Sequence, residues 1–158
     1  RQRLLLGVLA GLLVALGGVL LERLVVTDRE QIERVIYAVA AEIRAGRTEG
    51  AIEHLDPQAE EQRQRARSEL RLYKVSEISI KRPLEITVTP PENPTRARAE
   101  FNVVVTGGDV TGTITDQRVP RYLIVHFVKR EGRWYAADYE HLEPLHGMRT
   151  THDTPSSP

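Results

Sequence analysis

Hydrophobic and polar residues follow three different spacings along the chain, and each spacing predicts a different kind of segment. Residues 4–21 form a continuous apolar run without a charged side chain. Residues 27–46 repeat apolar side chains at helical spacing, with Thr27 or Asp28 as N-cap and Gly46 after the end. From Tyr73 onwards apolar and polar residues alternate, which is typical of strands with one buried face. The sequence therefore predicts an apolar N-terminal segment, then helices, then a β-sheet.

The apolar run is long enough to cross a bilayer. At about 1.5 Å per residue it spans about 27 Å, close to the ~30 Å hydrocarbon layer. A cleavable signal peptide is the alternative, but "LERLVV" follows the run without a small-x-small cleavage site. We therefore predict an uncleaved single-pass anchor over residues 1–26. Arg1 and Arg3 precede the span, which favours a cytoplasmic N-terminus and an extracytoplasmic domain in the cell membrane.

A stripe of small residues runs along the predicted anchor. Its members recur at i, i+4, i+8 and i+11, and they are Gly7, Gly11, Ala15 and Gly18. Small side chains let a second membrane helix approach closely. The partners we expect are therefore bilayer lipid and either other membrane-protein subunits or a second copy of the chain.

Two further helices are predicted before the sheet, over 48–56 and 57–72, the second with Pro57 in its first turn. That helix carries Arg63, Arg67 and Arg71 at successive i+4 positions, a spacing that could contact anionic lipid. Interspersed glutamates instead favour a solvated, salt-bridged face.

The alternating region predicts an antiparallel sheet. Its expected strands cover residues 75–80, 84–88, 96–105, 121–129 and 133–142. Glu131-Gly132 is expected to be a two-residue hairpin turn, whereas the Gly- and Thr-rich connection 106–120 is expected to be too long for a tight hairpin. We assign residues 27–145 to one domain and expect the polar segment 146–158 to be a disordered tail.

Composition and charge exclude several function classes. The chain has 22 basic and 22 acidic side chains, so no net positive field favours nucleic acid. It has no cysteine, which excludes thiolate catalysis and Cys-ligated metal. His126 and His141 match no metal-ligand spacing, so neither a metal nor another cofactor is expected.

Three stretches resemble the nuclear transport factor 2-like superfamily: the first helix ending in "AGR", the short "GAIEHLD" helix and the closing hairpin "FVKREGRWYAADYE". The resemblance covers residues 28–142. It implies an α+β, cystatin-like cone in which three helices and a curved antiparallel sheet enclose an enzyme pocket, a ligand cavity or a filled core. An anchor followed by such a domain also resembles the layout of type IV secretion assembly factors and Mce-associated membrane proteins. That layout implies a scaffold in the bacterial envelope.

The closing hairpin predicts which side chains face inward. A turn at 131–132 pairs Val128 with Tyr135, Phe127 with Ala136 and Val125 with Asp138. The concave side then carries the candidate cavity lining Phe101, Phe127, Trp134 and Asp138. The convex side carries the candidate interface Tyr122, Ile124, Tyr135 and Tyr139, because aromatic side chains with a polar tip suit a protein interface.

These assignments leave three functional hypotheses. The leading one is a membrane-anchored, non-catalytic scaffold acting through protein contacts. The alternatives are a cavity for a small apolar ligand or lipid, and a cyclase- or isomerase-type enzyme. By the resemblance, the enzyme would use an inward carboxylate as general base, which makes Asp138 a weak catalytic candidate. A pocket reaching past Trp134 would favour the alternatives, and a filled cone would favour the scaffold.

Overall fold

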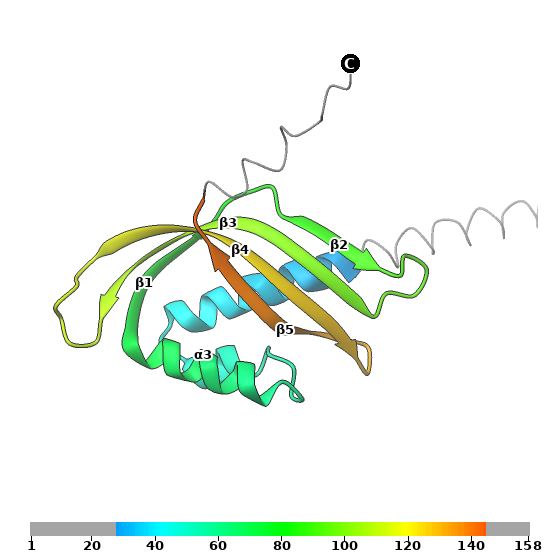
Figure 1. Ribbon diagram of the computed structural model, residues 1–158, viewed down its shortest axis with the longest axis horizontal. Helices are drawn as coiled ribbons and strands as arrows, with labels where there is room; N and C mark the ends of the chain where they lie inside the picture. The colour runs from blue at the N-terminus through cyan, green and yellow to red at the C-terminus, as the bar shows by residue number, and fades with distance from the viewer. Residues whose placement is uncertain (1–27, 145–158) are drawn as a thin grey trace, which may run out of the picture.

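The structure is a computed structural model that describes residues 28–144 (Figure 1). The predicted anchor 1–26, its small-residue stripe Gly7, Gly11, Ala15 and Gly18, and the predicted tail 146–158 lie outside the described residues and stay predictions. Among the described residues, none of the helices combines the length and hydrophobicity that crossing a bilayer requires.

The predicted first helix is confirmed and spans residues 28–44. It ends where the sequence predicts, because Gly46 adopts a left-handed φ of 70°. The Gly46 backbone N–H donates to the Ile43 carbonyl at 3.0 Å, and the Arg47 N–H donates to the Glu42 carbonyl at 2.9 Å. These bonds satisfy carbonyls that the last turn would otherwise leave unpaired.

The two shorter helices are α2 (Thr48–Ile52) and α3 (Glu60–Leu72). The prediction that Pro57 lies in the first turn of α3 is wrong, because residues 56–58 form a turn against the sheet. The Asp56 N–H donates to the Ala136 carbonyl at 2.8 Å, and the Gln58 N–H donates to Asp56 Oδ1 at 3.0 Å. The helix therefore begins at Glu60, after this turn is complete.

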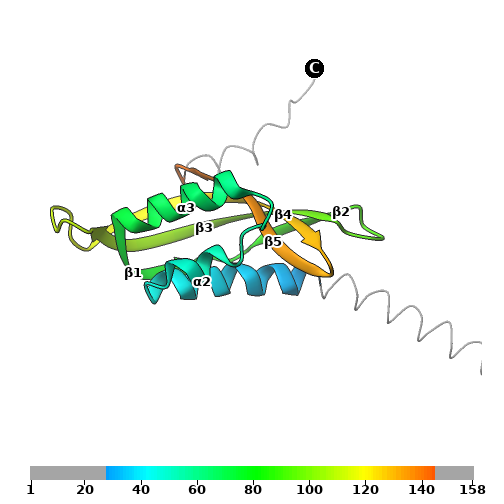
Figure 2. The ribbon, with the colours of Figure 1, turned by 90° about the horizontal axis from the view of Figure 1, so that it is seen from below.

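Five antiparallel strands form one sheet. They are β1 (Tyr73–Ile80), β2 (Glu85–Thr89), β3 (Arg96–Asp109), β4 (Gln117–Arg130) and β5 (Arg133–Leu142). The order is β1-β3-β4-β5, and β2 also pairs with β3. Figure 1 shows this sheet curving around the long first helix. Figure 2 shows that helix and α3 as two distinct rods running along the molecule.

The connection between β3 and β4 is shorter than the sequence predicts. The expected connection 106–120 is wrong, since β3 continues to Asp109 and β4 already begins at Gln117. Two glycines permit this pairing: a Cβ on Gly107 would collide with the Lys74 carbonyl, and one on Gly108 with the Ile114 carbonyl. Without side chains there, β1 and the β3–β4 loop both approach β3 closely.

One core fills the space between the helices and the sheet. Its largest fully buried side chains are Phe127, Ile32 and Ile52, and Trp134 and Phe101 are also buried against it. The alternation along β3 sets the inner face, because Ala97, Ala99, Phe101 and Val103 are buried while the residues between them are more exposed. The α+β fold with a curved antiparallel sheet is therefore as predicted.

Candidate functional site

The two ends of the domain differ, and the end nearest the β4–β5 hairpin is tightly closed. Asp28, 6% exposed, opens the first helix, and its Oδ1 accepts hydrogen bonds from Trp134 Nε1 at 2.8 Å and Lys129 Nζ at 2.7 Å. The indole thus fills the core and also holds the helix start against the hairpin.

A second carboxylate closes the same end. Asp56 is 4% exposed and accepts two hydrogen bonds from the Arg130 guanidinium, both at 2.7 Å. This bidentate contact, together with the Gln58 N–H, holds the pKa of Asp56 below its ordinary value. Both ionic contacts join residues far apart in sequence, so they fasten the helical segment to the hairpin.

The predicted cavity lining lies in the filled core. Phe101, Phe127 and Trp134 are each no more than 4% exposed and belong to the same hydrophobic core cluster. Neither of the two hollows described below includes any of them in its lining. The structure therefore brings these three residues together in the hydrophobic core, and they line neither hollow.

The predicted inward position of Asp138 is wrong because β5 contains a bulge. Val128 pairs with Tyr135 and Phe127 with Ala136 as predicted, but His126, not Val125, pairs with Asp138. One extra residue on β5 exchanges the two faces for every side chain beyond it. Asp138 consequently lies on the convex face, where its Oδ1 accepts the Tyr139 backbone N–H at 2.8 Å.

The same bulge turns Tyr139 inward. Tyr139, predicted on the convex face, packs against the core, and its hydroxyl donates to Glu69 of α3 at 2.8 Å. Burial and the adjacent Glu69 raise the pKa of this phenol. The guanidinium of Arg65 lies 4.8 Å from the ring centroid, so Tyr139 joins β5 to α3.

The remaining convex candidates are only partly available to a partner. Ile124 is 8% exposed, so neighbouring side chains already cover it. Tyr122 donates its hydroxyl to Glu100 at 2.7 Å, and burial together with this carboxylate raises the pKa of Tyr122 to about 12. Tyr135 stacks beneath Arg133, whose guanidinium carbon lies 5.6 Å from the ring centroid.

The two histidines and the α3 arginines are also placed by the structure. His126 lies on the convex face, whereas His141 pairs with Leu123 beyond the bulge and so lies on the inner face. Arg67 contacts Glu49 at 3.1 Å and Glu60 at 3.7 Å, and Arg63 contacts Glu60 at 3.7 Å. For these two arginines the predicted salt-bridged face of α3 is confirmed.

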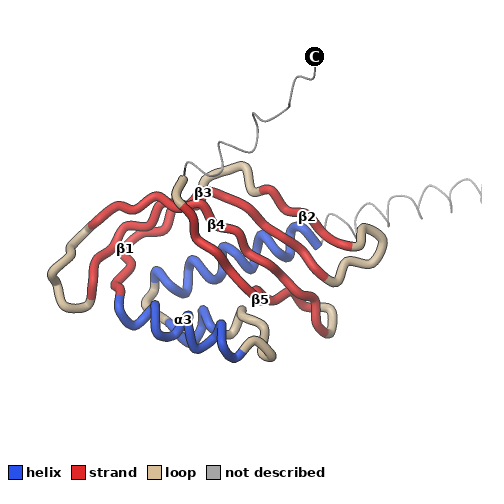
Figure 3. Tube along the Cα trace, viewed as in Figure 1, coloured by secondary structure: helices blue, strands red, loops and turns tan. Residues whose placement is uncertain are grey.

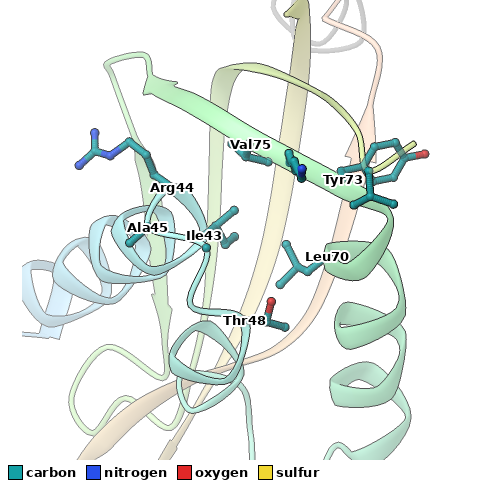
Figure 4. A pocket seen from close by; sticks show the side chains of 10 residues that line it. Ile43, Arg44, Ala45, Thr48, Leu70, Tyr73 and Val75 are labelled. Atoms are coloured by element: carbon teal, nitrogen blue, oxygen red, sulfur yellow. The ribbon is translucent and has the colours of Figure 1, made fainter. Parts of the chain in front are cut away.

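The opposite end of the domain contains a hollow of about 400 Å³ (Figure 4). It lies between the end of the first helix, the start of α2, the end of α3 and the start of β1. Its lining consists of Ile43, Arg44, Ala45, Gly46, Thr48, Leu70, Tyr73, Lys74, Val75 and Val110. Figure 4 shows Ile43 and Leu70 approaching one another across this space.

The lengths of the elements explain the hollow. Each of the 14-residue strands β3 and β4 extends up to about 46 Å, whereas the first helix is only about 25 Å long. The β3–β4 loop consequently projects beyond the end of that helix (Figure 3). The inner surface of the sheet is thus left without its main cover at this end.

Four apolar side chains are exposed at this end of the domain, and Tyr73 and Val110 among them line the hollow. Leu72 is 57% exposed, Tyr73 56% and Val110 46%, and Ile114 in the β3–β4 loop is 43% exposed. A second hollow of about 390 Å³, between β1 and this loop, shares Lys74, Val75 and Val110 with the first. We call these four exposed residues, Leu72, Tyr73, Val110 and Ile114, the apolar rim.

Sequence reasoning missed this site. The usable signal was the apolar pair Leu72-Tyr73, which stands where helical spacing changes to strand spacing. At such a junction the apolar face of the helix does not continue as an apolar face of the strand, so apolar side chains can be left uncovered. Whether such residues are covered depends on where the first helix ends with respect to the end of β3. That relation is set by tertiary packing.

Comparisons with known proteins support the fold. No protein-family model matches the chain, and no curated protein matches it by sequence. Among solved structures, it is similar to a cystatin-like protein of unknown function from Nostoc punctiforme, with TM-score 0.52 and 15% identity over 75% of this chain and 96% of that one.

Two further structures are less similar. A proposed polyketide cyclase from Silicibacter sp. TM1040 has TM-score 0.46 and 18% identity over 76% of this chain and 94% of that one. A protein named as an NTF2 type, Rd1NTF2_05, has TM-score 0.48 and 16% identity over 73% and 99%. The similarity to the Nostoc punctiforme protein shows a cystatin-like fold, and a fold of this kind does not by itself assign a function.

Proposed function

We propose that this domain is a non-catalytic binding module that holds a small apolar ligand in the hollow between the first helix, α3 and β1. The observation that carries this proposal is the coincidence of a concave space with exposed apolar side chains. A volume of about 400 Å³ lies within the range of ligand sites, about 300–1,000 Å³. Large apolar side chains left exposed together mark binding surfaces more often than scattered ones do.

The lining supports binding more than catalysis. Ile43, Leu70, Val75 and Val110 supply apolar surface, while Thr48 supplies a hydroxyl. The lining contains no carboxylate or histidine that could act as a general base. The cyclase hypothesis depended on an inward Asp138, and the β5 bulge removes that basis.

A neutral fluorescent probe, N-phenyl-1-naphthylamine, tests the proposal without involving charge. The full chain, reconstituted in lipid nanodiscs with the signal of empty nanodiscs subtracted, should enhance the probe's fluorescence. Leu70→Glu places a charge in the hollow and should weaken binding at least about tenfold. Gln64→Glu adds the same charge at an exposed position of the same helix and should leave binding unchanged. Equal binding by both variants would overturn the proposal.

A scaffold role is the second candidate, favoured by the apolar rim. Leu72 and Tyr73 stand next to each other at the α3–β1 junction, and the Leu72 carbonyl accepts the Val110 N–H at 3.1 Å, which holds three rim residues together. Replacing Leu72 and Ile114 with Ser would then abolish co-purification of a partner while leaving probe binding in the hollow intact. Loss of probe binding with the partner still co-purifying would favour the ligand site.

The membrane location remains part of the proposal on sequence grounds alone. The apolar run 4–21 precedes the described domain and would hold the binding module beside a bilayer. Carbonate washing should leave the full chain in the membrane fraction, and deletion of residues 1–26 should release a folded domain. Recovery of the full chain in the carbonate supernatant would contradict the anchor.

A further inference from the structure

The charged lining of the hollow points to a particular ligand class. Arg44 and Lys74 both border the hollow, and no acidic side chain is part of its lining. Resting on the function proposed above, we propose that the hollow binds an amphipathic anion, a single-chain fatty acid of about ten carbons, with its carboxylate beside Lys74.

Charge complementarity is the first argument. Within residues 28–144, neither Lys74 nor Arg44 lies within 4.0 Å of a carboxylate oxygen, whereas Arg47, Arg63, Arg65 and Arg67 around the same helices are each paired. A lysine ammonium offers three hydrogen-bond donors to a carboxylate. The two cations are thus without an ion-pair partner among the described residues.

Lys74 is the better placed of the two. Figure 4 shows the Arg44 side chain directed away from the hollow, along the outside of the first helix. Lys74 lies on β1, borders both hollows and is exposed to solvent. A carboxylate beside it would remain at the rim while the chain enters between Ile43 and Leu70.

Volume decides the kind of chain. At about 30 Å³ per water-sized group, a hollow of about 400 Å³ accepts about thirteen such groups. A methylene is close to that size, so one chain of about ten carbons and its carboxylate would fill the hollow.

A photoreactive decanoate carrying a diazirine near its terminal methyl group tests the inference on the full chain in nanodiscs. Labelling should map by mass spectrometry to peptides containing residues 43–48 or 70–75. Unlabelled decanoate should compete about fifteenfold better than octanoate, because each methylene contributes about fourfold in affinity. Decanoate should also compete about tenfold better than the neutral decanol, which lacks the charged head.

Lys74→Gln should remove the advantage of decanoate over decanol while leaving decanol competition unchanged. Lys81→Gln is the matched control, because it removes the same charge just past the other end of β1, about 23 Å away. It should change competition by neither decanoate nor decanol. Both side chains are exposed, so circular dichroism should show unchanged folding.

The outcomes separate this inference from the function on which it rests. Labelling outside the hollow, or none, would overturn the binding site itself. Labelling in the hollow with equal competition by decanoate and decanol would overturn the assignment of an anion and leave an apolar site in place. Equal loss of decanoate preference in the Lys74 and Lys81 variants would reject Lys74 as the contact.

Discussion

The two ends of the domain use similar residue types in opposite ways. At the hairpin end, Trp134 is buried and its indole N–H is bonded to a buried carboxylate. At the α3–β1 end, Tyr73 is 56% exposed beside a hollow, and Lys74 has no carboxylate within ion-pair distance among the described residues. The difference indicates that stability is concentrated at one end and that the other end is left able to bind.

This contrast follows from how far each element extends. The first helix begins under the hairpin and covers the sheet there, but it ends before β3 and β4 do. Apolar side chains of the sheet that lie under the helix are buried in the core. Apolar side chains beyond the end of the helix face solvent. Four substitutions test the contrast, from the largest expected effect to the smallest.

Trp134→Ala should destabilise the protein by about 3 to 5 kcal/mol, since it leaves a cavity and also removes the indole donor to Asp28. Urea unfolding followed by circular dichroism measures this change, because the chain has no other tryptophan for fluorescence. Arg67→Ala, which removes only surface ion pairs, should stay within about 0.5 kcal/mol. Similar losses in the two variants would contradict the assignment of the hairpin end as the stable one.

Asp56→Asn should cost about 1 to 2 kcal/mol at pH 7, because it removes the charge that Arg130 binds, although the 37% exposed arginine can be solvated. The Arg130 hydrogen bond lowers the pKa of Asp56, so this stabilisation is complete above its ordinary value of 3.8 and is lost as the pH falls through the lower folded-state value.

Unfolding measured between pH 6 and pH 2 checks the sign of the Asp56 effect. The stability difference between the wild type and Asp56→Asn should be constant above pH 3.8 and should shrink below it. A difference that grows as the pH falls would mean that Asp56 is not held ionised by Arg130.

Gly108→Ala should cost about 1 kcal/mol or more, because its Cβ would collide with the Ile114 carbonyl and displace the β3–β4 loop. Thermal unfolding measures the loss. Probe binding in the hollow should weaken in parallel, since the same loop carries Val110. Unchanged stability and binding would show that the loop is not packed on β3 as the structure has it.

Tyr73→Ser should change stability by no more than about 0.5 kcal/mol, because the side chain is largely exposed. It should nevertheless reduce the affinity for N-phenyl-1-naphthylamine severalfold, since the ring borders the hollow. A large loss of stability would place Tyr73 in the core and would end the contrast between the two ends.

Sequence patterns were sufficient for the elements that depend on local spacing. The first helix, its end at Gly46 and the turn at Glu131-Gly132 were all predicted, because capping and turn residues act over a few positions. The inward position of Trp134 also followed from the register next to that turn. These features need no knowledge of distant segments.

Tertiary structure alone decided which side chains of β5 face inward beyond the bulge. The bulge between His126 and Phe127 in the β4–β5 pairing exchanged Asp138 for Tyr139 on the inner face, where Tyr139 meets Glu69 of α3. No local signal in "WYAADYE" marks this extra residue, because the gain comes from packing across the molecule. The hollow has the same origin: residues 71–74 are exposed because the first helix, distant in sequence, ends before the strands that it covers.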